Sequence, residues 1–349
     1  MKSKIFGLVA IVIIFILLVF SFMRTQKSGK IGRKLTDTGG HIVTVPVHPK
    51  RFADLWFPID EVMVMLGASD KVVVTVGRSQ TMPWLFHMAP ELNKAIQING
   101  PVPNAETLQA AAVDVAFTAS DSPATAAVNR IGIPTLEAGF TNTHSFGRAI
   151  NLIADVVHTD TAHQAADRYN KEVTQVVTAI RAKTDLLSLS ARPRVLHILS
   201  LAPLQVDGDH TIIDEWITVA GGRNAAVGVT GNKKVVSPEQ LAQWDPDIII
   251  LGASARHNNI DEAVWKNLRA VRDKKVFRNP SGAFAWDRYG LEYPLQLQWT
   301  AKLLHPDLFS DIDIRIKTAE FYRNFMHYSV SPKETDAILA ALPPAGNIK

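Results

Sequence analysis

The sequence predicts an α/β fold of two lobes, each with a mainly parallel sheet, bridged by a single long α-helix. Three observations support this fold class. The stretch 161–187 reads as a helix longer than an ordinary globular one. Short apolar strands alternate with helices on both sides of it, which is typical of parallel sheets covered by helices. One short motif also occurs once on each side.

The predicted bridging helix has its apolar residues on one face. They recur at steps of three and four, at Ala165, Tyr169, Val173, Val176, Val177 and Ile180. Thr161 and Gln164 have capping-box spacing at its start, and Pro193 prevents it from running far past Leu187. About 26 residues at roughly 1.5 Å each give a rod of about 39 Å, long enough to join two bodies. The alternative is a long surface helix on one large domain.

The segments on either side of this helix define two lobes. We expect an N-terminal lobe over residues 41–157, a bridging segment over 158–190 and a C-terminal lobe over 191–349. The predicted strands of the first lobe are 41–45, 51–56, 71–76, 114–118 and 133–137, with helices at 59–66 and 106–112. The predicted strands of the second are 194–199, 248–251 and 275–277, with a helix at 212–219.

The recurring motif is a helix start followed by a strand start. Asn104 precedes Glu106, and Asp114 follows eight residues later; Ser237, Glu239 and Asp247 have the same spacing. In each copy the first residue can cap a helix, and the acid sits in its first turn, where the helix dipole favours it. The pattern predicts one equivalent unit in each lobe, although two similar helix starts can also arise by chance.

Net charge and cysteine content exclude several functions. Of 37 Lys and Arg residues, seven lie in residues 1–34 with no acid, so the remaining 30 face 33 acidic residues. The pI near 9.2 therefore comes from the N-terminal tail and does not indicate nucleic-acid binding. The chain has no cysteine, which excludes disulfides, thiolate metal sites and a lipid-modified cysteine.

The N-terminus predicts export. Lys2 and Lys4 precede an apolar run over residues 5–23, whose length falls between a signal peptide and a membrane anchor. Ser21 offers a weak cleavage site, and the basic residues that follow oppose translocation of that side. We therefore expect residues 1–23 to be a signal peptide or anchor and residues 24–40 to be a basic linker, with cleavage left open.

Over residues 40–345 the chain resembles the periplasmic substrate-binding proteins of bacterial ABC importers for ferric siderophores, haem and cobalamin. The resemblance is carried by the two helix-start units and by VDG at 206–208, AGGRN at 220–224, WKNLRAV at 265–271, KVF at 275–277, GAFAWD at 282–287 and LHPDLF at 304–309. It implies two Rossmann-like lobes bridged by one long helix, a ligand in the cleft between them, and docking onto a membrane permease. Unlike many relatives, the chain lacks the cysteine of a lipid anchor.

Loops that follow the predicted strands supply the candidate ligand-binding residues, because ligands bind beyond the carboxyl ends of parallel strands. Aromatic rings and cationic groups there suit a large, partly apolar, anionic chelate. Each residue also has a structural alternative, packing for the tryptophans and solvation for the arginines. The candidates are Trp56, Arg78, Trp84 and His87 in the first lobe, and His210, Arg256, His257, Trp286, Arg288 and Tyr289 in the second.

Two further roles concern acids and histidines. The resemblance implies that Glu106 and Glu239 engage arginines of the permease, although the helix dipole alone would explain an acid there. His87, His210 and His257 are candidates for direct coordination of nickel, cobalt or ferric iron, but no paired histidine spacing marks them. Binding of an intact chelate is the stronger hypothesis.

No catalytic motif is present, since the chain has neither G-x-S-x-G nor H-E-x-x-H, and residues 228–234 lack P-loop spacing. We therefore expect a monomeric, non-enzymatic extracytoplasmic protein without a cofactor of its own. It would capture a metal chelate, with a ferric siderophore as the first choice, and deliver it to an ABC importer. Haem, cobalamin and nickel or cobalt complexes stay open as ligands. An anchored enzyme or a ligand sensor attached through residues 5–23 is the alternative.

Overall fold

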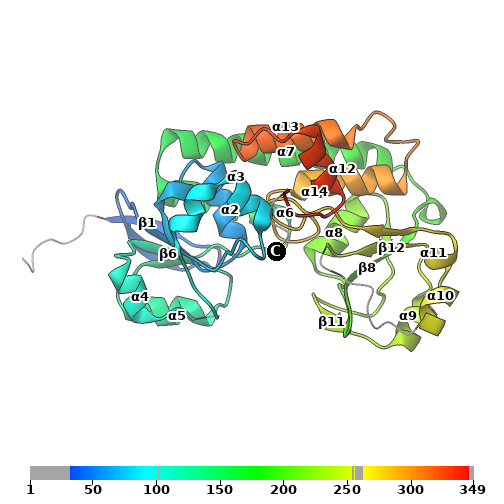
Figure 1. Cartoon of the computed structure of the whole chain (residues 1–349), viewed down its shortest axis with the longest axis horizontal. Helices are drawn as coiled ribbons and strands as arrows, with labels where there is room; N and C mark the ends of the chain where they lie inside the picture. Colours follow the sequence, from blue (N-terminus) through cyan, green and yellow to red (C-terminus); the bar gives the residue numbers. More distant parts are fainter. Residues whose placement is uncertain (1–31, 101, 254, 256–261, 346–349) are drawn as a thin grey trace, which may run out of the picture.

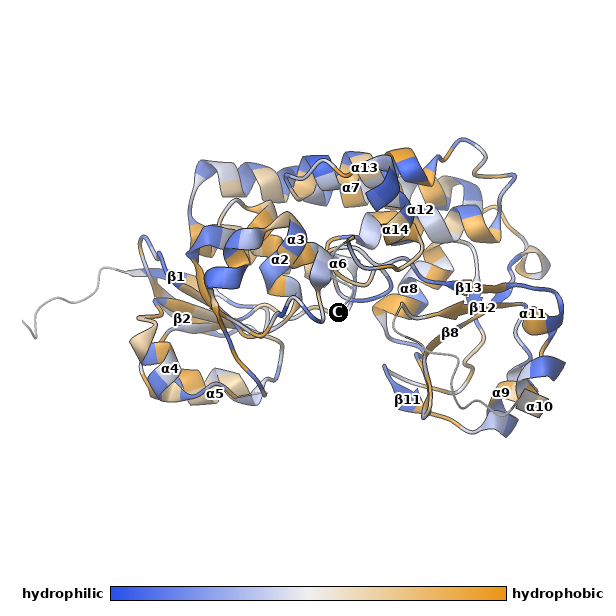
Figure 2. Ribbon diagram, viewed as in Figure 1, coloured by the Kyte–Doolittle hydropathy of each residue, from blue (hydrophilic) through white to orange (hydrophobic). Residues whose placement is uncertain are grey.

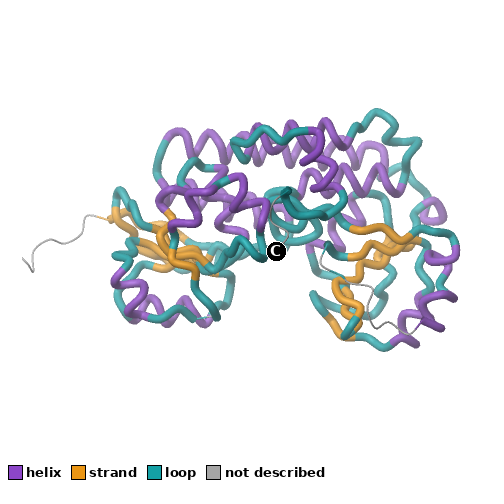
Figure 3. Tube along the Cα trace, viewed as in Figure 1, coloured by secondary structure: helices purple, strands orange, loops and turns teal. Residues whose placement is uncertain are grey.

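The computed structural model describes residues 32–345 except 101, 254 and 256–261. It has two α/β lobes, with helix α7 (Asp160–Thr184) running along the top of both (Figure 1). Strands form two separate groups, one in each lobe, and loops fill the centre between them (Figure 3). The predicted fold class is confirmed.

The first lobe is built on a fully parallel five-stranded sheet. Its order is β5 (Ile96–Gln97), β4 (Val72–Thr75), β3 (Phe52–Asp54), β6 (Val115–Thr118) and β7 (Thr135–Glu137). β3, β4 and β6 carry almost only buried residues, as expected of strands with helices on both faces. The helices of this lobe are α2 (Pro58–Met65), α3 (Pro83–Met88), α4 (Ala105–Ala110), α5 (Pro123–Arg130) and α6 (Thr143–Val157).

The second lobe has a mixed sheet. Its order is β11 (Lys234–Val235), β9 (Leu204–Val206), β8 (Arg194–Leu201), β12 (Ile248–Leu251) and β13 (Val276–Arg278), and β10 (Arg223–Asn224) also pairs with β8. β8, β10, β12 and β13 run parallel, whereas β9 and β11 are antiparallel. Its helices are α8 (Ile212–Val219), α9 (Pro238–Trp244), α10 (Glu262–Asn267), α11 (Arg269–Arg272), α12 (Tyr293–Leu304), α13 (Ile314–Phe325) and α14 (Pro332–Leu339).

Helix α7 packs against both lobes. Thr159 caps it by accepting a hydrogen bond from the Ala162 amide, so the helix starts slightly earlier than expected and ends at Thr184 rather than near Leu187. Its apolar face contacts α6 and α2 of the first lobe and α12 and α8 of the second. Orange and blue residues alternate along its ribbon in Figure 2, as expected of an amphipathic helix. The largest apolar cluster is therefore continuous from one lobe to the other.

The linker prediction is wrong for residues 32–36. They form strand β1 (Gly32–Thr36), which pairs antiparallel with β2 (Ile42–Pro46). One of the basic residues in this segment also attaches it to the first lobe. The Arg33 guanidinium donates to the carbonyls of Asp155 (2.6 Å) and Val156 (3.1 Å) at the end of α6. The other linker residues, 24–31, and the predicted anchor, 1–23, lie outside the described residues.

Residues 327–342 cross back from the second lobe to the first. His327 Nε2 is 3.1 Å from the Met65 carbonyl, and Trp84 Nε1 donates to the Leu342 carbonyl at 2.8 Å. The Ile338 carbonyl accepts from Ser281 in the loop after β13. This returning segment therefore contacts both lobes.

Candidate functional site

A hollow of about 280 Å³ lies between the lobes, and we call it the interlobe hollow. It is lined by the loop after β4 in the first lobe, by the loops after β12 and β13 in the second, and by the returning segment. The carboxyl ends of parallel strands from both lobes thus converge on it, as expected of a ligand site in an α/β protein. The lining residues are 81–84, 253, 281–285 and 341–343.

A larger hollow, of about 820 Å³, lies at the outer edge of the first lobe. It is bounded by the turn between β1 and β2, by α5 and by β7, and no second-lobe residue lines it. We place the candidate site in the interlobe hollow because that hollow, unlike the larger one, is built from both lobes.

Buried polar groups shape the first-lobe side of the site. The Thr75 hydroxyl donates to Asp60 Oδ2 (2.6 Å) and accepts from the Gly77 amide (2.7 Å). A side chain at Gly77 would collide with Asp60, so this turn requires glycine. Burial and the nearby Asp60 carboxyl hold the pKa of Asp54 well above its ordinary value, and burial raises the pKa of Asp60 to about 6. These contacts fix the start of the loop that contains Arg78.

Two of the predicted first-lobe residues, Arg78 and Trp56, are not buried in the core and remain candidates for ligand binding. Arg78 is half-buried, and its guanidinium has no hydrogen bond or ion pair with any residue that the structure describes. Trp56 packs edge-on against Phe140, with ring centroids 4.9 Å apart, and Phe140 contacts Tyr289 of the second-lobe loop at 5.7 Å. The Tyr289 hydroxyl accepts from Asn232 at 2.6 Å. Trp56 and Tyr289 therefore belong to one aromatic contact between the lobes.

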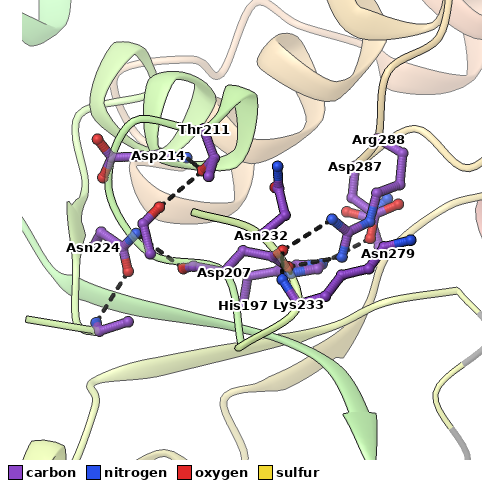
Figure 4. A network of polar contacts seen from close by, with 12 residues as sticks. His197, Asp207, Thr211, Asp214, Asn224, Asn232, Lys233, Asn279, Asp287 and Arg288 are labelled. Atoms are coloured by element: carbon purple, nitrogen blue, oxygen red, sulfur yellow. Dashed lines mark hydrogen bonds and ion pairs between the residues drawn. The ribbon is translucent and has the colours of Figure 1, made fainter. Parts of the chain in front are cut away.

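The prediction that Arg288 is free to bind ligand is wrong for this structure. Its two terminal nitrogens donate to Asp207, at 3.0 and 2.7 Å, as the dashed lines in Figure 4 show. His197 lies between two acids, 2.8 Å from Asp207 and 2.7 Å from Asp287. All four side chains are nearly inaccessible to solvent. Arg288 therefore belongs to a buried charge network.

The network sets opposite pKa shifts for its acid and its base. Burial alone would raise the pKa of Asp207, but the hydrogen bonds from His197 and Arg288 outweigh it and hold that pKa well below its ordinary value. Burial alone would lower the pKa of His197, but its hydrogen bonds to Asp207 and Asp287 raise it. Sequence reasoning missed this network, although Asp207 and Asp287 lie inside the motifs VDG and GAFAWD.

Neither Trp84 nor Trp286 presents a free ring to the cleft. They are 2% and 1% exposed, and both belong to the apolar core. Trp84 forms part of the wall of the interlobe hollow but is pinned to Leu342. The Trp286 indole donates to the Tyr322 hydroxyl at 3.3 Å. The prediction that Trp286 lines the cleft is wrong, because its large apolar surface is more stable in the core.

The predicted histidines do not converge. His87 Nε2 is 3.0 Å from the Tyr328 hydroxyl and 3.3 Å from Glu334, both in the returning segment. The His210 ring is 82% exposed and pairs with its neighbour Asp209. Arg256 and His257 lie outside the described residues. Within the part of the chain that the structure describes, no three potential metal ligands gather at one point.

The two helix-start units are equivalent in three dimensions. Asn104 caps α4 and Ser237 caps α9, while Asp114 accepts from the Arg51 amide (3.1 Å) and Asp247 from the Arg194 amide (2.8 Å). Each aspartate thus fixes the start of a neighbouring strand. Glu106 and Glu239 are exposed in the first turns of α4 and α9, which lie at the lower ends of the two lobes (Figure 1). The motif therefore marks matched positions on both lobes.

Comparison with known proteins agrees with this architecture. A curated relative, the molybdate-binding protein MolA of Haemophilus influenzae, is 26% identical over 328 residues, which cover 86% of this chain and 92% of MolA. The crystal structure of molybdate-bound MolA superposes with a TM-score of 0.77 at 24% identity, over 86% of this chain and 99% of that one. A periplasmic solute-binding protein from Veillonella parvula gives 0.76 at 24% identity, over 88% and 96%. Nickel-bound CeuE of Helicobacter pylori gives 0.71 at 16%, over 88% and 99%.

A family model described as a periplasmic binding protein matches residues 59–283. Across residues 32–345, apart from the gaps given above, no helix is both long and apolar enough to cross a membrane. The match spans more than half of the sequence and includes α7, every strand of the second-lobe sheet and all strands of the first-lobe sheet except β3. The chain therefore belongs to the periplasmic binding protein family, whose members bind solutes outside the cytoplasm for ABC importers and catalyse no reaction.

Proposed function

We propose that this protein captures a small anionic metal species in the interlobe hollow and hands it to an ABC importer. The observation that carries the proposal is the convergence of strand ends from both lobes on one hollow. The loop that supplies residues 81–84 to its wall also contains Arg78, whose guanidinium has no partner among the described residues. An unpaired, half-buried guanidinium favours an anion, because it can donate several hydrogen bonds to ligand oxygens.

The volume of the interlobe hollow limits which ligands can bind there. About 280 Å³ accommodates a tetrahedral oxyanion such as molybdate or a compact chelate, and is small for haem or a large siderophore. The similarity to molybdate-binding MolA points the same way. Molybdate thus replaces the ferric siderophore as our first choice, and a compact anionic iron or nickel chelate is the second.

Calorimetry with sodium molybdate, sodium sulfate and a ferric catecholate tests this proposal. We expect saturable one-to-one binding of one metal species, and Arg78→Ala should weaken it by about 10- to 100-fold through loss of charged hydrogen bonds. Arg130→Ala, an exposed change on α5, is the matched control and should leave binding unchanged. Absence of binding to all three probes, or equal affinity in wild type and Arg78→Ala, would refute the proposal.

Docking through Glu106 and Glu239 is the second part of the proposal. Two exposed acids at matched positions of two lobes can be recognised by the two halves of a permease, and the rigid α7 keeps their separation nearly constant. Glu106→Ala with Glu239→Ala should leave ligand affinity within about 0.5 kcal/mol but strongly reduce uptake. Asp70→Ala with Asp307→Ala removes one exposed acid from each side of the molecule elsewhere and serves as the control. Normal uptake by the glutamate double variant would show that Glu106 and Glu239 only stabilise the starts of their helices and do not dock the permease.

A further inference from the structure

Two buried glutamates meet where the first lobe contacts the segment that leads into α12. Glu61 lies on α2 and Glu292 immediately precedes α12, and both side chains are fully buried. Glu61 Oε2 accepts from the Leu291 amide at 2.7 Å, and the Leu291 carbonyl accepts from the Tyr169 hydroxyl of α7 at 2.8 Å. A carboxyl group of the first lobe therefore helps to anchor a segment of the second.

In each glutamate, one carboxyl oxygen accepts a hydrogen bond and the other has no hydrogen-bond partner in the protein. Glu292 Oε1 accepts from the Phe284 amide (3.0 Å) and from the Tyr322 hydroxyl (3.1 Å). Glu61 Oε1 and Glu292 Oε2 are buried without a hydrogen-bond partner in the protein. Two carboxylates with no counter-charge would be very costly here, since a buried ionised group needs a partner. One proton between the two orphan oxygens would satisfy both at once.

No cationic side chain among the described residues could neutralise this pair in place of a proton. The titratable groups that face the pair are Asp60 from α2, Tyr169 from α7, Tyr293 from α12 and Tyr322 from α13. Among the described residues no basic side chain makes a hydrogen bond or ion pair with either glutamate. Burial and then the neighbouring Glu292 carboxyl raise the pKa of Glu61 well above its ordinary value.

We propose that Glu61 and Glu292 share one proton and act as a proton-dependent clasp between the lobes. The neutral Glu61 carboxyl donates from Oε1 to Glu292 Oε2, while its other oxygen accepts from Leu291. Loss of the proton places two like charges face to face and pushes α2 away from the segment 290–292. Gly290 allows the close approach, since a Cβ there would lie 3.2 Å from both Glu61 oxygens.

The clasp also reaches the interlobe hollow. Glu292 Oε1 accepts from the Phe284 amide, and Phe284 is one of the residues that line the hollow. Ionisation of the pair therefore disturbs the loop 281–285 as well as the contact with α2. Because the clasp is a property of the protein alone, it can be tested without knowing the ligand.

Infrared spectroscopy of the purified protein gives the direct test. A protonated carboxyl band should be present at neutral pH in wild type and should lose intensity in both Glu61→Gln and Glu292→Gln. Asp54→Asn removes another buried acid with a raised pKa, next to Asp60, and separates the contribution of that pair to the band. Glu215→Gln is the matched control, because Glu215 also joins the lobes, by accepting from the Thr143 amide at 3.0 Å. An unchanged band in both Glu61→Gln and Glu292→Gln would overturn the proposal.

Hydrogen exchange tests the mechanical consequence. After correction for the intrinsic rate, the Leu291 and Phe284 amides of wild type should exchange about tenfold faster for each pH unit above the raised pKa of the pair. In Glu61→Gln the side-chain amide donates permanently to Glu292, so protection of both amides should no longer depend on pH. Protection that is independent of pH in wild type, or a pH dependence that persists in Glu61→Gln, would contradict the clasp.

Discussion

The two lobes bury acids in opposite ways. In the second lobe Asp207 is surrounded by Arg288 and His197 and is ionised, with its pKa held down. In the first lobe Asp54 lies against Asp60 with no cation, and burial pushes its pKa up. The comparison teaches that complete burial does not by itself determine a carboxyl's charge. The neighbouring groups decide whether a counter-ion or a proton neutralises it.

The comparison predicts opposite pH responses. Asp207 stabilises the fold at pH above its ordinary unfolded value, and this contribution is lost as pH falls through its depressed pKa. His197 has a raised pKa, so its contribution is lost as pH rises through that value. Asp60 contributes most below its ordinary pKa, and its contribution is lost as pH rises through about 6.

The largest expected effect comes from removing the cation. Arg288→Met should lower the free energy of unfolding by about 3 to 5 kcal/mol, because the buried Asp207 carboxylate then keeps only His197 and the Lys233 amide as donors among the described residues. Urea unfolding at neutral pH measures this loss. A cost below about 1 kcal/mol would mean that Arg288 contributes no more than an exposed ion pair.

A smaller effect of opposite sign is expected in the first lobe. Asp54→Asn supplies a permanent donor toward Asp60 where wild type needs a proton, so it should raise stability at about pH 8 by roughly 1 to 3 kcal/mol. Near pH 3 the variant should match wild type, because Asp54 is then mostly protonated in both the folded and the unfolded state. Unfolding curves at the two pH values provide the measurement, and an equal change at both would contradict the assignment.

The smallest effect is expected at an ion pair that is exposed to solvent, which tests whether burial is what makes Arg288 important. Arg269 pairs with Asp245 (3.4 Å) and Asp247 (2.8 Å), but it is half exposed. Arg269→Met should cost no more than about 1 kcal/mol, since water screens this pair. Unfolding in low and high salt would check the result. A loss as large as that of Arg288→Met would show that burial is not what distinguishes the two arginines.

Local periodicity made part of the fold predictable. The apolar face of α7 was visible because it recurs over 25 residues, and the duplicated helix start marked matched positions in both lobes. Strand β1 escaped because its five residues are mostly polar and pair only with β2. Short polar strands have no periodicity strong enough to separate them from a linker.

The site was less predictable because side-chain direction is decided by packing. A tryptophan in a loop after a strand reads the same whether it faces a cleft or the core, and Trp286 faces the core. Arg288 looked free because its partner, Asp207, is 81 residues away. The Glu61 contact spans 230 residues, from α2 to Leu291, and no local pattern in one sequence pairs such distant residues.

The returning segment has a consequence for the order in which the chain matures. Trp84 is sealed by Leu342, 258 residues later, and the Met65 carbonyl is covered by His327, 262 residues later. During synthesis or passage through a membrane the first lobe emerges long before these residues do. The part of the first lobe around Trp84 and Met65 therefore stays uncovered until residues 327–342 have been made. This delays folding of the first lobe and prolongs the exposure of apolar surface that can aggregate. The first lobe is finished last, although it is made first.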